Sequence, residues 1–347
     1  MVGVGKRVFV FLVVILGGIY LWLRLYGFEE KTTFHLDQGL HLMESWEMIK
    51  NRDIRLIGPM VSSKTFMDRG FFIGPQYYYV LSFLGGLTDW NPILIDLFLL
   101  FLEFGFIIYF TFWIFKKLGS IEALTVFAIF TFSRFFIIHS RFFWNPHFLL
   151  PLGIMAIVFL DKYINKNRIK YLAFFSFCWG IGFGFHYAAI LWAIPLFIIL
   201  FKNEKLWCKD IFIIPVFFIL GDLPWFIFEL RNNFYNIKTI WWAMTQSADG
   251  SKIEPHYLVY PWVIFILYWL AKKIYKIKKG KVFLGLILII SVSLCQVFLI
   301  RDIMPYGHPI GWNYVIEKEV VKKILNNSCP SDFNIASTVS GDTRSYD

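Results

Sequence analysis

The feature that most constrains this chain is a succession of long apolar segments separated by short polar ones. A run of about 18 or more apolar residues is long enough to cross a bilayer as a helix. The chain is 58% hydrophobic and only 17% charged, a balance outside the range of ordinary soluble domains. We therefore predict an all-α, polytopic membrane protein. Its apolar segments lie at about 8–25, 71–88, 93–115, 121–138, 147–160, 171–185, 188–201, 211–228, 257–271 and 281–300.

The positive charge of the chain, +10 overall, is concentrated in the turns between apolar segments. Short lysine-rich turns are typical of cytoplasmic loops and not of a basic face that binds nucleic acid. We therefore expect membrane lipids as neighbours and no nucleic-acid partner. The clusters are "KK" at 116–117, "DKYINKNRIK" at 161–170, "FKNEKLWCKD" at 201–210 and "AKKIYKIKKGK" at 271–281.

The first apolar run and the cysteines exclude two other classes of protein. The run 8–25 is longer than the core of a signal peptide and no small-residue cleavage site follows it, which favours an uncleaved helix with the N-terminus inside. The four cysteines include no CxxC pair, so the spacing indicates neither a zinc site nor a disulfide framework.

The lysine clusters also predict which polar stretches share the outer face of the membrane. They place 26–70, 229–256 and the tail after residue 300 outside. The segment 71–88 conflicts with this count, because a full crossing there would put Lys116 outside. Either this segment dips into the membrane without crossing, or one lysine cluster breaks the charge rule. Its Gly-Pro pair at 74–75 makes a short or broken helix plausible.

We divide the chain into a transmembrane domain over 1–301 and a polar tail over 302–347. Apolar residues at helical spacing predict a helix over 314–327, and "FNIASTV" at 333–339 has the pattern of a short buried strand. A helix followed by a strand is expected to open a small extracytoplasmic α/β domain, which the chain is expected to leave incomplete.

The stretch "FHLDQGLHLMESWEMI" at 34–49 predicts an amphipathic helix in the first outer loop. At helical spacing Asp37, His41 and Glu44 share one face, opposite an apolar face. Asp37 fits either chemistry or a helix N-cap, and Glu44 and Glu47 fit a solvated face. A metal site formed by Asp37, His41 and Glu44 remains an alternative, although no metal is indicated.

Positively charged side chains are predicted on the same outer face as Asp37. Arg69 follows Asp68 just before a Gly-Pro break, and Tyr77 then opens an apolar helix. Tyrosine at this depth is also typical of an interfacial belt. Guanidinium groups bind phosphate in a bidentate manner, so arginines on this face fit a phosphate ligand, and ordinary juxtamembrane charge is the alternative. The cluster consists of Arg69, Arg141, His186 and Arg231.

Several motifs occur in an order that resembles the GT-C glycosyltransferases. Asp37 soon after the first helix and "GPQYYY" at 74–79 are followed by "SRFFWNPHFLLPL" at 140–152, "GFGFHYAAILWAIPL" at 182–196 and "GDLPWFIFELRNNFYN" at 221–236. This pattern is similar to the protein O-mannosyltransferases and the lipid A aminoarabinose transferases, glycosyltransferase families 39 and 83. The resemblance covers roughly residues 8–300 and implies a GT-C-type helical bundle.

The resemblance implies transfer of a sugar from a polyprenyl-phosphate donor to a hydroxyl acceptor, at the outer face of the cell membrane. Asp37 would be the general base, and Arg69, Arg141, Arg231 and His186 would bind the donor phosphate. No cofactor is implied, and the acceptor is left open. The family usually has Asp-Glu where this chain has Asp37–Gln38, so a second carboxylate would come from Asp68 or Glu44. Gln38, His41, Glu44 and Tyr77 complete the loop candidates.

Two other functions were weighed against the enzyme. A transporter or flippase for lipid-linked glycans would carry ionisable residues inside the membrane, for which Asp96, Glu103 and Arg134 are candidates. A non-catalytic subunit is the second alternative, favoured by Gln38. The concentration of polar residues in the outer loops favours the enzyme.

Overall fold

The computed structural model describes residues 5–32, 34, 36–61, 70–202, 211–246, 255–277, 285, 289 and 314–327. In these ranges the chain is helical and forms no strand, apart from one isolated antiparallel bridge between Met60 and Phe72. The all-α fold class predicted from the sequence is therefore confirmed.

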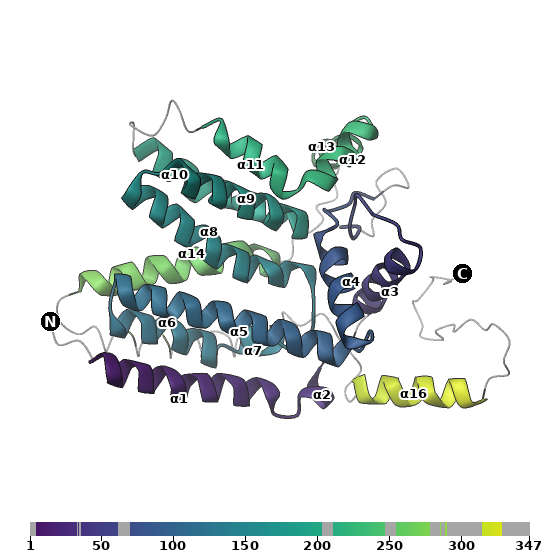
Figure 1. Ribbon diagram of the computed structural model, residues 1–347, viewed down its shortest axis with the longest axis horizontal. Helices are drawn as coiled ribbons and strands as arrows, with labels where there is room; N and C mark the ends of the chain where they lie inside the picture. The colour runs from purple at the N-terminus through teal and green to yellow at the C-terminus, as the bar shows by residue number, and fades with distance from the viewer. Residues whose placement is uncertain are drawn as a thin grey trace.

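Long helices lie side by side and form the body of the molecule (Figure 1). Three of them are long and apolar enough to cross a membrane: α1 (Lys6–Leu25), α5 (Pro92–Lys117) and the span Asn145–Lys166, which contains α8 (Leu149–Lys166). A bent pair is a fourth candidate. The shorter helices of the body are α6 (Ser120–Phe132), α7 (Arg134–His139), α9 (Ile169–Phe185), α10 (Ala193–Lys202) and α14 (Pro255–Lys276).

Two predicted segments are each broken into two helices. Between α6 and α7 the backbone of Ser133 is extended, and its hydroxyl accepts a hydrogen bond from the amide of Phe136 at 3.5 Å. The second break separates α11 (Ile213–Gly221) from α12 (Leu223–Arg231), which are bent by 89°. A serine cap and a Pro near the start of α12 act locally, so hydropathy averaged over a window does not detect these breaks.

The body has two chemically different ends. At the end near the N-terminus, α5 ends at Lys117 and α8 ends at Lys166, and we name it the lysine end. There the buried carboxylate of Asp161 pairs with Lys117 and accepts a hydrogen bond from the Tyr268 hydroxyl at 2.8 Å, which joins α5, α8 and α14.

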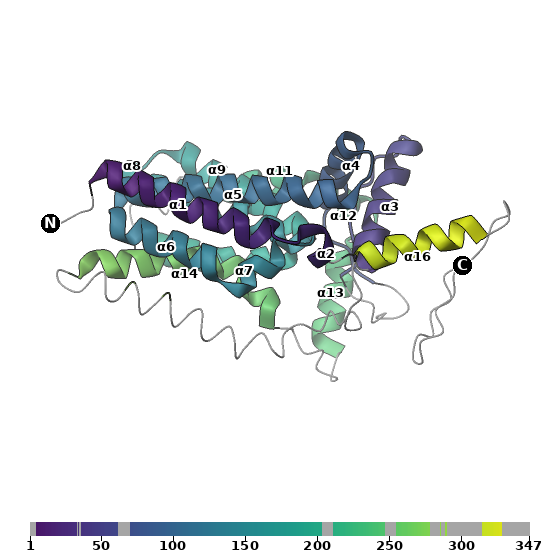
Figure 2. The ribbon, with the colours of Figure 1, turned by 90° about the horizontal axis from the view of Figure 1, so that it is seen from below.

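The opposite end, which we name the loop end, carries the short helices (Figure 1). These are α2 (Phe28–Lys31), α3 (Leu36–Lys50), α4 (Gln76–Thr88), α13 (Tyr235–Gln246) and α16 (Tyr314–Asn327). Figure 2 shows the same separation after a quarter turn, so it does not depend on one view.

Helix α4 explains the conflict over the segment 71–88. The helix begins only at Gln76, because Pro75 forms its N-cap and Phe72 is bridged to Met60 in extended backbone. It lies across the loop end beside α3, and α5 then starts from that same end (Figure 1). The segment therefore does not cross the body, which agrees with the dipping alternative.

Close packing of the body depends on glycine and on one buried arginine. A Cβ atom at Gly180 of α9 would lie 2.1 Å from the Phe218 carbonyl oxygen of α11, so these helices approach too closely for any larger residue. Arg24, at the end of α1, is fully buried over the Tyr20 ring and donates to the Phe130 carbonyl of α6 at 2.8 Å.

The polar tail is only partly described. Helix α16 coincides with the predicted helix 314–327 and lies beside α2, with the Tyr314 ring 6.1 Å from that of Phe34. The predicted strand at 333–339 and nearly all of the apolar segment 281–300 fall outside the described residues.

Candidate active site

Asp37 lies in the first turn of α3, and its side chain is exposed at the loop end. It interacts electrostatically with His41, one turn later, and with Tyr77 of α4. The His41 ring is 5.4 Å from that of Tyr77 and 6.0 Å from that of Tyr78, in the packed contact between α3 and α4. Asp37 is therefore an exposed carboxylate close to a buried aromatic contact between α3 and α4.

His41 is neutral at physiological pH in this setting. Burial lowers the pKa of His41 to about 4, although the nearby Asp37 carboxylate raises it. Its Nδ1 atom is buried and has no hydrogen-bond partner among the described residues. Asp37 thus does not face a cationic imidazole, so its negative charge is not neutralised from this side.

Glu44 and Glu47 remain partly exposed, as the predicted solvated face requires, with 34% and 41% of their side-chain surfaces exposed. Arg55 pairs with Glu44, and its guanidinium also lies 3.6 Å from Glu47. The carbonyl of Arg55 accepts a hydrogen bond from the Tyr79 hydroxyl, and this bond connects the segment after α3 to α4. Gln38, next to Asp37, is buried with 3% of its surface exposed. Glu44 therefore has a structural role, and it is not a free second carboxylate.

The structure places three of the predicted phosphate ligands at the loop end and on different elements. Arg141 follows α7 and donates to the Leu23 carbonyl at 2.7 Å, and both burial and the nearby Arg24 lower the pKa of Arg141. Arg231 is exposed at the end of α12. The His186 imidazole caps the turn after α9 by accepting from the amide of Ala188 at 3.1 Å.

Asp68 and Arg69 lie outside the described residues. The roles of Asp68 as a second carboxylate and of Arg69 as a phosphate ligand therefore stay predictions from sequence.

The extended segment 70–75, just before α4, is held by side chains from distant parts of the chain. The Phe72 carbonyl accepts hydrogen bonds from Trp225 Nε1 at 2.9 Å and from the Tyr187 hydroxyl. The Phe72 amide donates to Asn236 Oδ1 at 2.8 Å, and Asn236 in turn donates to the buried carboxylate of Glu229 at 2.8 Å. Two motif stretches that are separate in sequence, 182–196 and 221–236, therefore meet at this segment.

A second contact of the same kind fixes the start of α4. Gln76 donates to the buried carboxylate of Asp222, at the bend between α11 and α12, at 2.6 Å. A Cβ at Gly74 would lie 2.4 Å from that carboxylate and 2.8 Å from the Cα of Gly184, so only glycine fits this approach. Asp222, Glu229 and Asn236 were not singled out from the sequence, although all three lie in the stretch 221–236 that carries the resemblance.

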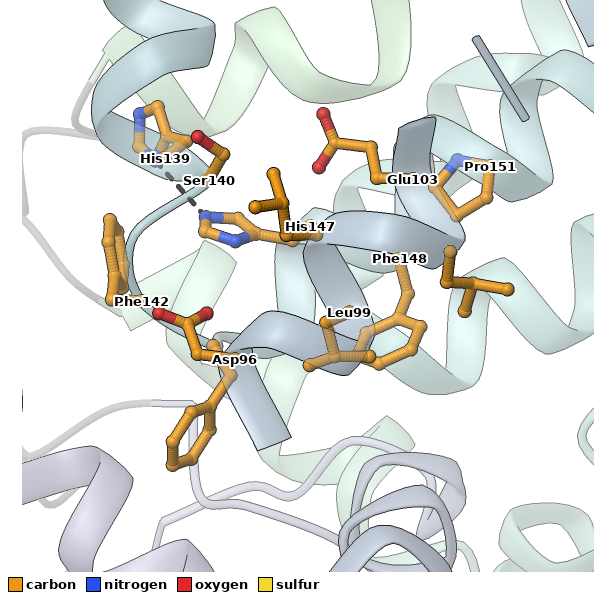
Figure 3. A pocket seen from close by; sticks show the side chains of 12 residues that line it. Asp96, Leu99, Glu103, His139, Ser140, Phe142, His147, Phe148 and Pro151 are labelled. Atoms are coloured by element: carbon orange, nitrogen blue, oxygen red, sulfur yellow. Dashed lines mark hydrogen bonds between the residues drawn. The ribbon is translucent and has the colours of Figure 1, made fainter. Parts of the chain in front are cut away.

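Near Tyr77, whose ring is 6.1 Å from that of the lining residue Phe148, there is a small cavity between α5 and the segment 139–151, lined by several ionisable groups (Figure 3). His139 Nδ1 and His147 Nε2 are 3.1 Å apart at its wall. Asp96 and Glu103 of α5 line it too, whereas Arg134, grouped with them in the transporter hypothesis, is exposed and does not. Sequence gave no signal for the two histidines, because eight residues separate them.

No group of three or more His, Cys, Asp or Glu side chains gathers in a metal-binding arrangement within the described ranges. Asp37, His41 and Glu44 all belong to those ranges, so the metal site considered for them is not formed by these three residues.

The helical body and the loop-end assembly define an all-α, polytopic membrane protein. Residues 77–227, from α4 to α12, match the model of the dolichyl-phosphate-mannose-protein mannosyltransferase family. This match and the fold identify a membrane glycosyltransferase of the GT-C type, as the motifs indicated. No curated protein and no solved structure matches the chain. Helix α3 with Asp37 lies just before the matched region.

Proposed function

We propose that this protein transfers a sugar from a polyprenyl-phosphate donor to a hydroxyl acceptor, with Asp37 as the general base. The observation that carries the proposal is the place of Asp37: an exposed carboxylate that interacts electrostatically with Tyr77, where the matched region begins. A carboxylate positioned at a reacting hydroxyl removes its proton as the sugar is transferred. The family match supports the donor class, because that family is named for transfer of mannose from dolichyl phosphate.

Three other acids of the loop end are held by structural partners. Glu44 is paired with Arg55, and Asp222 and Glu229 are buried in the contacts that hold the segment 70–76. None of these carboxylates can meet an acceptor without breaking a contact of the fold. This distribution of roles favours Asp37 as the base.

The leaving group is a lipid phosphate, and its negative charge must be stabilised as the sugar departs. Arg141 and Arg231 are the described arginines of the loop end that we assign to this task, together with His186 and Arg69. Arg141 still has guanidinium nitrogens beyond the one that Leu23 binds, and its Nε has no partner among the described residues. The proposal involves no cofactor, because Asp37 supplies the base and the arginines supply the positive charge. His186, whose Nδ1 accepts from the Ala188 amide, can donate a hydrogen bond from Nε2.

We assign the loop end to the outer face of the cell membrane. Lysines concentrate at the opposite end of the body, where α5, α8 and α14 terminate, and lysine-rich ends stay inside. The donor would then enter from the outer leaflet. The sugar and the acceptor are left open.

The test is transfer of labelled mannose from dolichyl-phosphate mannose by the protein in liposomes, with membrane extract as acceptor. Asp37→Asn keeps the shape of the side chain but cannot accept a proton, so we expect the rate to fall by about 100-fold or more. Asp53→Asn, the same change at an exposed residue of the loop end, is the matched control and should keep the wild-type rate. A wild-type rate in Asp37→Asn would refute the base assignment.

The donor class is tested in the same assay. If the wild-type protein moves no sugar from dolichyl-phosphate mannose or dolichyl-phosphate glucose to any fraction of the extract, the proposed activity is wrong. Binding of both lipids without transfer would instead favour the transporter or the non-catalytic subunit.

A further inference from the structure

The cavity near Tyr77 contains a buried acid, Asp96, for which the fold does not provide a full set of hydrogen-bond partners. Asp96 is only 2% exposed, and its Oδ2 atom has no hydrogen-bond partner among the described residues. Buried polar atoms nearly always have such a partner, because an unmet one costs free energy. Asp96 points into the cavity, toward His147 across it (Figure 3). An occupant of the cavity with hydroxyl groups would satisfy this carboxylate.

Glu103, the other acid of the cavity, has a partner within the protein. It lies two turns further along α5 and interacts electrostatically with the buried Arg24 of α1. Arg24 donates to the carbonyls of Phe130 and Thr131, so this arginine and its counter-charge belong to the contact between α1 and α6. For Asp96 no such cation is found in the part of the chain that the structure describes, where its electrostatic neighbours are Tyr77 and Glu103.

The size and lining of the cavity define what fits. Its free volume is about 30 Å³, which is room for about two water-sized groups and not for a whole sugar ring. Its polar lining comprises Asp96, Glu103, His139, Ser140 and His147, and its apolar lining includes the rings of Phe142 and Phe148. Asp96 and Ser140 can accept hydrogen bonds from hydroxyl groups. Two neighbouring hydroxyls on one edge of a sugar match this combination.

The cavity also lies between a lipid-facing surface and the proposed base. Leu102, part of its lining, is 39% exposed on α5, beside the exposed Phe98 and Phe101. Tyr77 interacts electrostatically with both Asp96 and Asp37. Arg141, proposed to bind the donor phosphate, directly follows Ser140 of the cavity wall.

We propose that this cavity receives the hydroxyl edge of the donor sugar and that Asp96 accepts its hydrogen bonds. The inference rests on the proposed function and adds a specificity residue to it. A lipid-linked sugar reaches the cavity from the membrane side of α5, with its phosphate near Arg141. Asp37 then lies across Tyr77 from the bound sugar. In the absence of donor, water fills the same space.

The experiment compares two lipids that differ only in the sugar. Binding of dolichyl-phosphate mannose and of dolichyl phosphate to the full chain in nanodiscs is measured by native mass spectrometry. We expect the wild-type protein to prefer the mannosyl lipid, and Asp96→Asn to lose about tenfold of that preference, because the amide offers one acceptor oxygen to the sugar hydroxyls where the carboxyl group offers two. Affinity for dolichyl phosphate itself should not change. Asp89→Asn, at an exposed turn residue, is the matched control.

A second variant separates binding from folding. Asp96→Leu removes the acid altogether. Because the Asp96 side chain lacks a partner in the described part of the fold, we expect the thermal unfolding midpoint of this variant not to fall. Its preference for the mannosyl lipid should disappear. A large loss of stability with an unchanged preference would identify Asp96 as structural and overturn the inference.

The remaining outcomes are also decisive. A wild-type protein that binds both lipids equally, or an Asp96→Asn variant that keeps the full preference, would show that water alone occupies the cavity. Failure of the wild-type protein to bind either lipid would instead count against the proposed function.

Discussion

At the scale of single residues, α3 carries one exposed and one largely buried ionisable group, a single turn apart. Asp37 is exposed, whereas His41, one turn later, is largely buried against the tyrosines of α4. Because Asp37 and His41 are so close in sequence, helical spacing alone predicts that they are neighbours. Only the packing of α4 decides that one of them is kept neutral.

The His41 pKa predicts a loss of stability in mild acid. The folded pKa of about 4 lies below the usual 6.5, so the unfolded chain binds more protons between these values. Stability is therefore complete above about pH 6.5 and declines as the pH falls toward 4, by at most about 3 kcal/mol from this group. His41→Phe keeps the ring but cannot be protonated, and should reduce that decline.

The measurement is the thermal unfolding midpoint of both proteins in nanodiscs between pH 7.5 and 4.5, followed by tryptophan fluorescence. Equal pH dependence in wild type and His41→Phe would contradict the burial of this imidazole.

At the scale of elements, the α12–α13 corner depends on one buried carboxylate. Glu229 is 1% exposed and accepts hydrogen bonds from the amides of Asn236 and Ile237 at 3.1 and 3.0 Å, at the start of α13. Negative charge at a helix N-terminus is favourable, because the first amides have no partner within the helix. Through Asn236 the same carboxylate also positions the amide of Phe72.

Glu229→Gln should therefore loosen two elements at once. We expect a loss of about 2–4 kcal/mol, since the buried amides lose a charged acceptor. Hydrogen–deuterium exchange should rise in α13 and in the segment 70–76 together. Glu319→Gln, at an exposed position of α16, serves as the control and should change neither. Faster exchange in α13 alone would show that Asn236 does not transmit the effect.

At the scale of the whole molecule, α4 determines which connections share a face. Because α4 lies across the loop end, the turn before α5 and the segment after α3 are on the same side of the body (Figure 1). The lysine-rich ends of α5, α8 and α14 then all lie at the opposite end of the body.

This topology predicts a labelling pattern. In a background without native cysteines, Asn51→Cys and Asp89→Cys should react with a membrane-impermeant maleimide from the same side of sealed vesicles. Lys166→Cys, at the lysine end, should react only from the other side. Each of the three positions is exposed. Opposite reactivity of Asn51→Cys and Asp89→Cys would mean that α4 crosses the membrane.

The sequence alone determined the class of protein and much of its chemistry. Apolar runs and lysine-rich turns are local features, so they predicted the all-α membrane fold, most helices and the helix at 314–327. The ordered motifs predicted the GT-C family type, which the match over 77–227 confirms. The α3 helix with Asp37 in its first turn also follows from residues next to each other in the chain.

Only the tertiary structure decided which polar groups meet. The bond from Phe72 to Asn236 joins residues 164 positions apart, and the one from Gln76 to Asp222 joins residues 146 apart. The pairing of Glu44 with Arg55 and the cavity beside Asp96 likewise depend on packing. A single sequence carries no local signal for such contacts, because their free energy depends on burial and on partners that folding brings together.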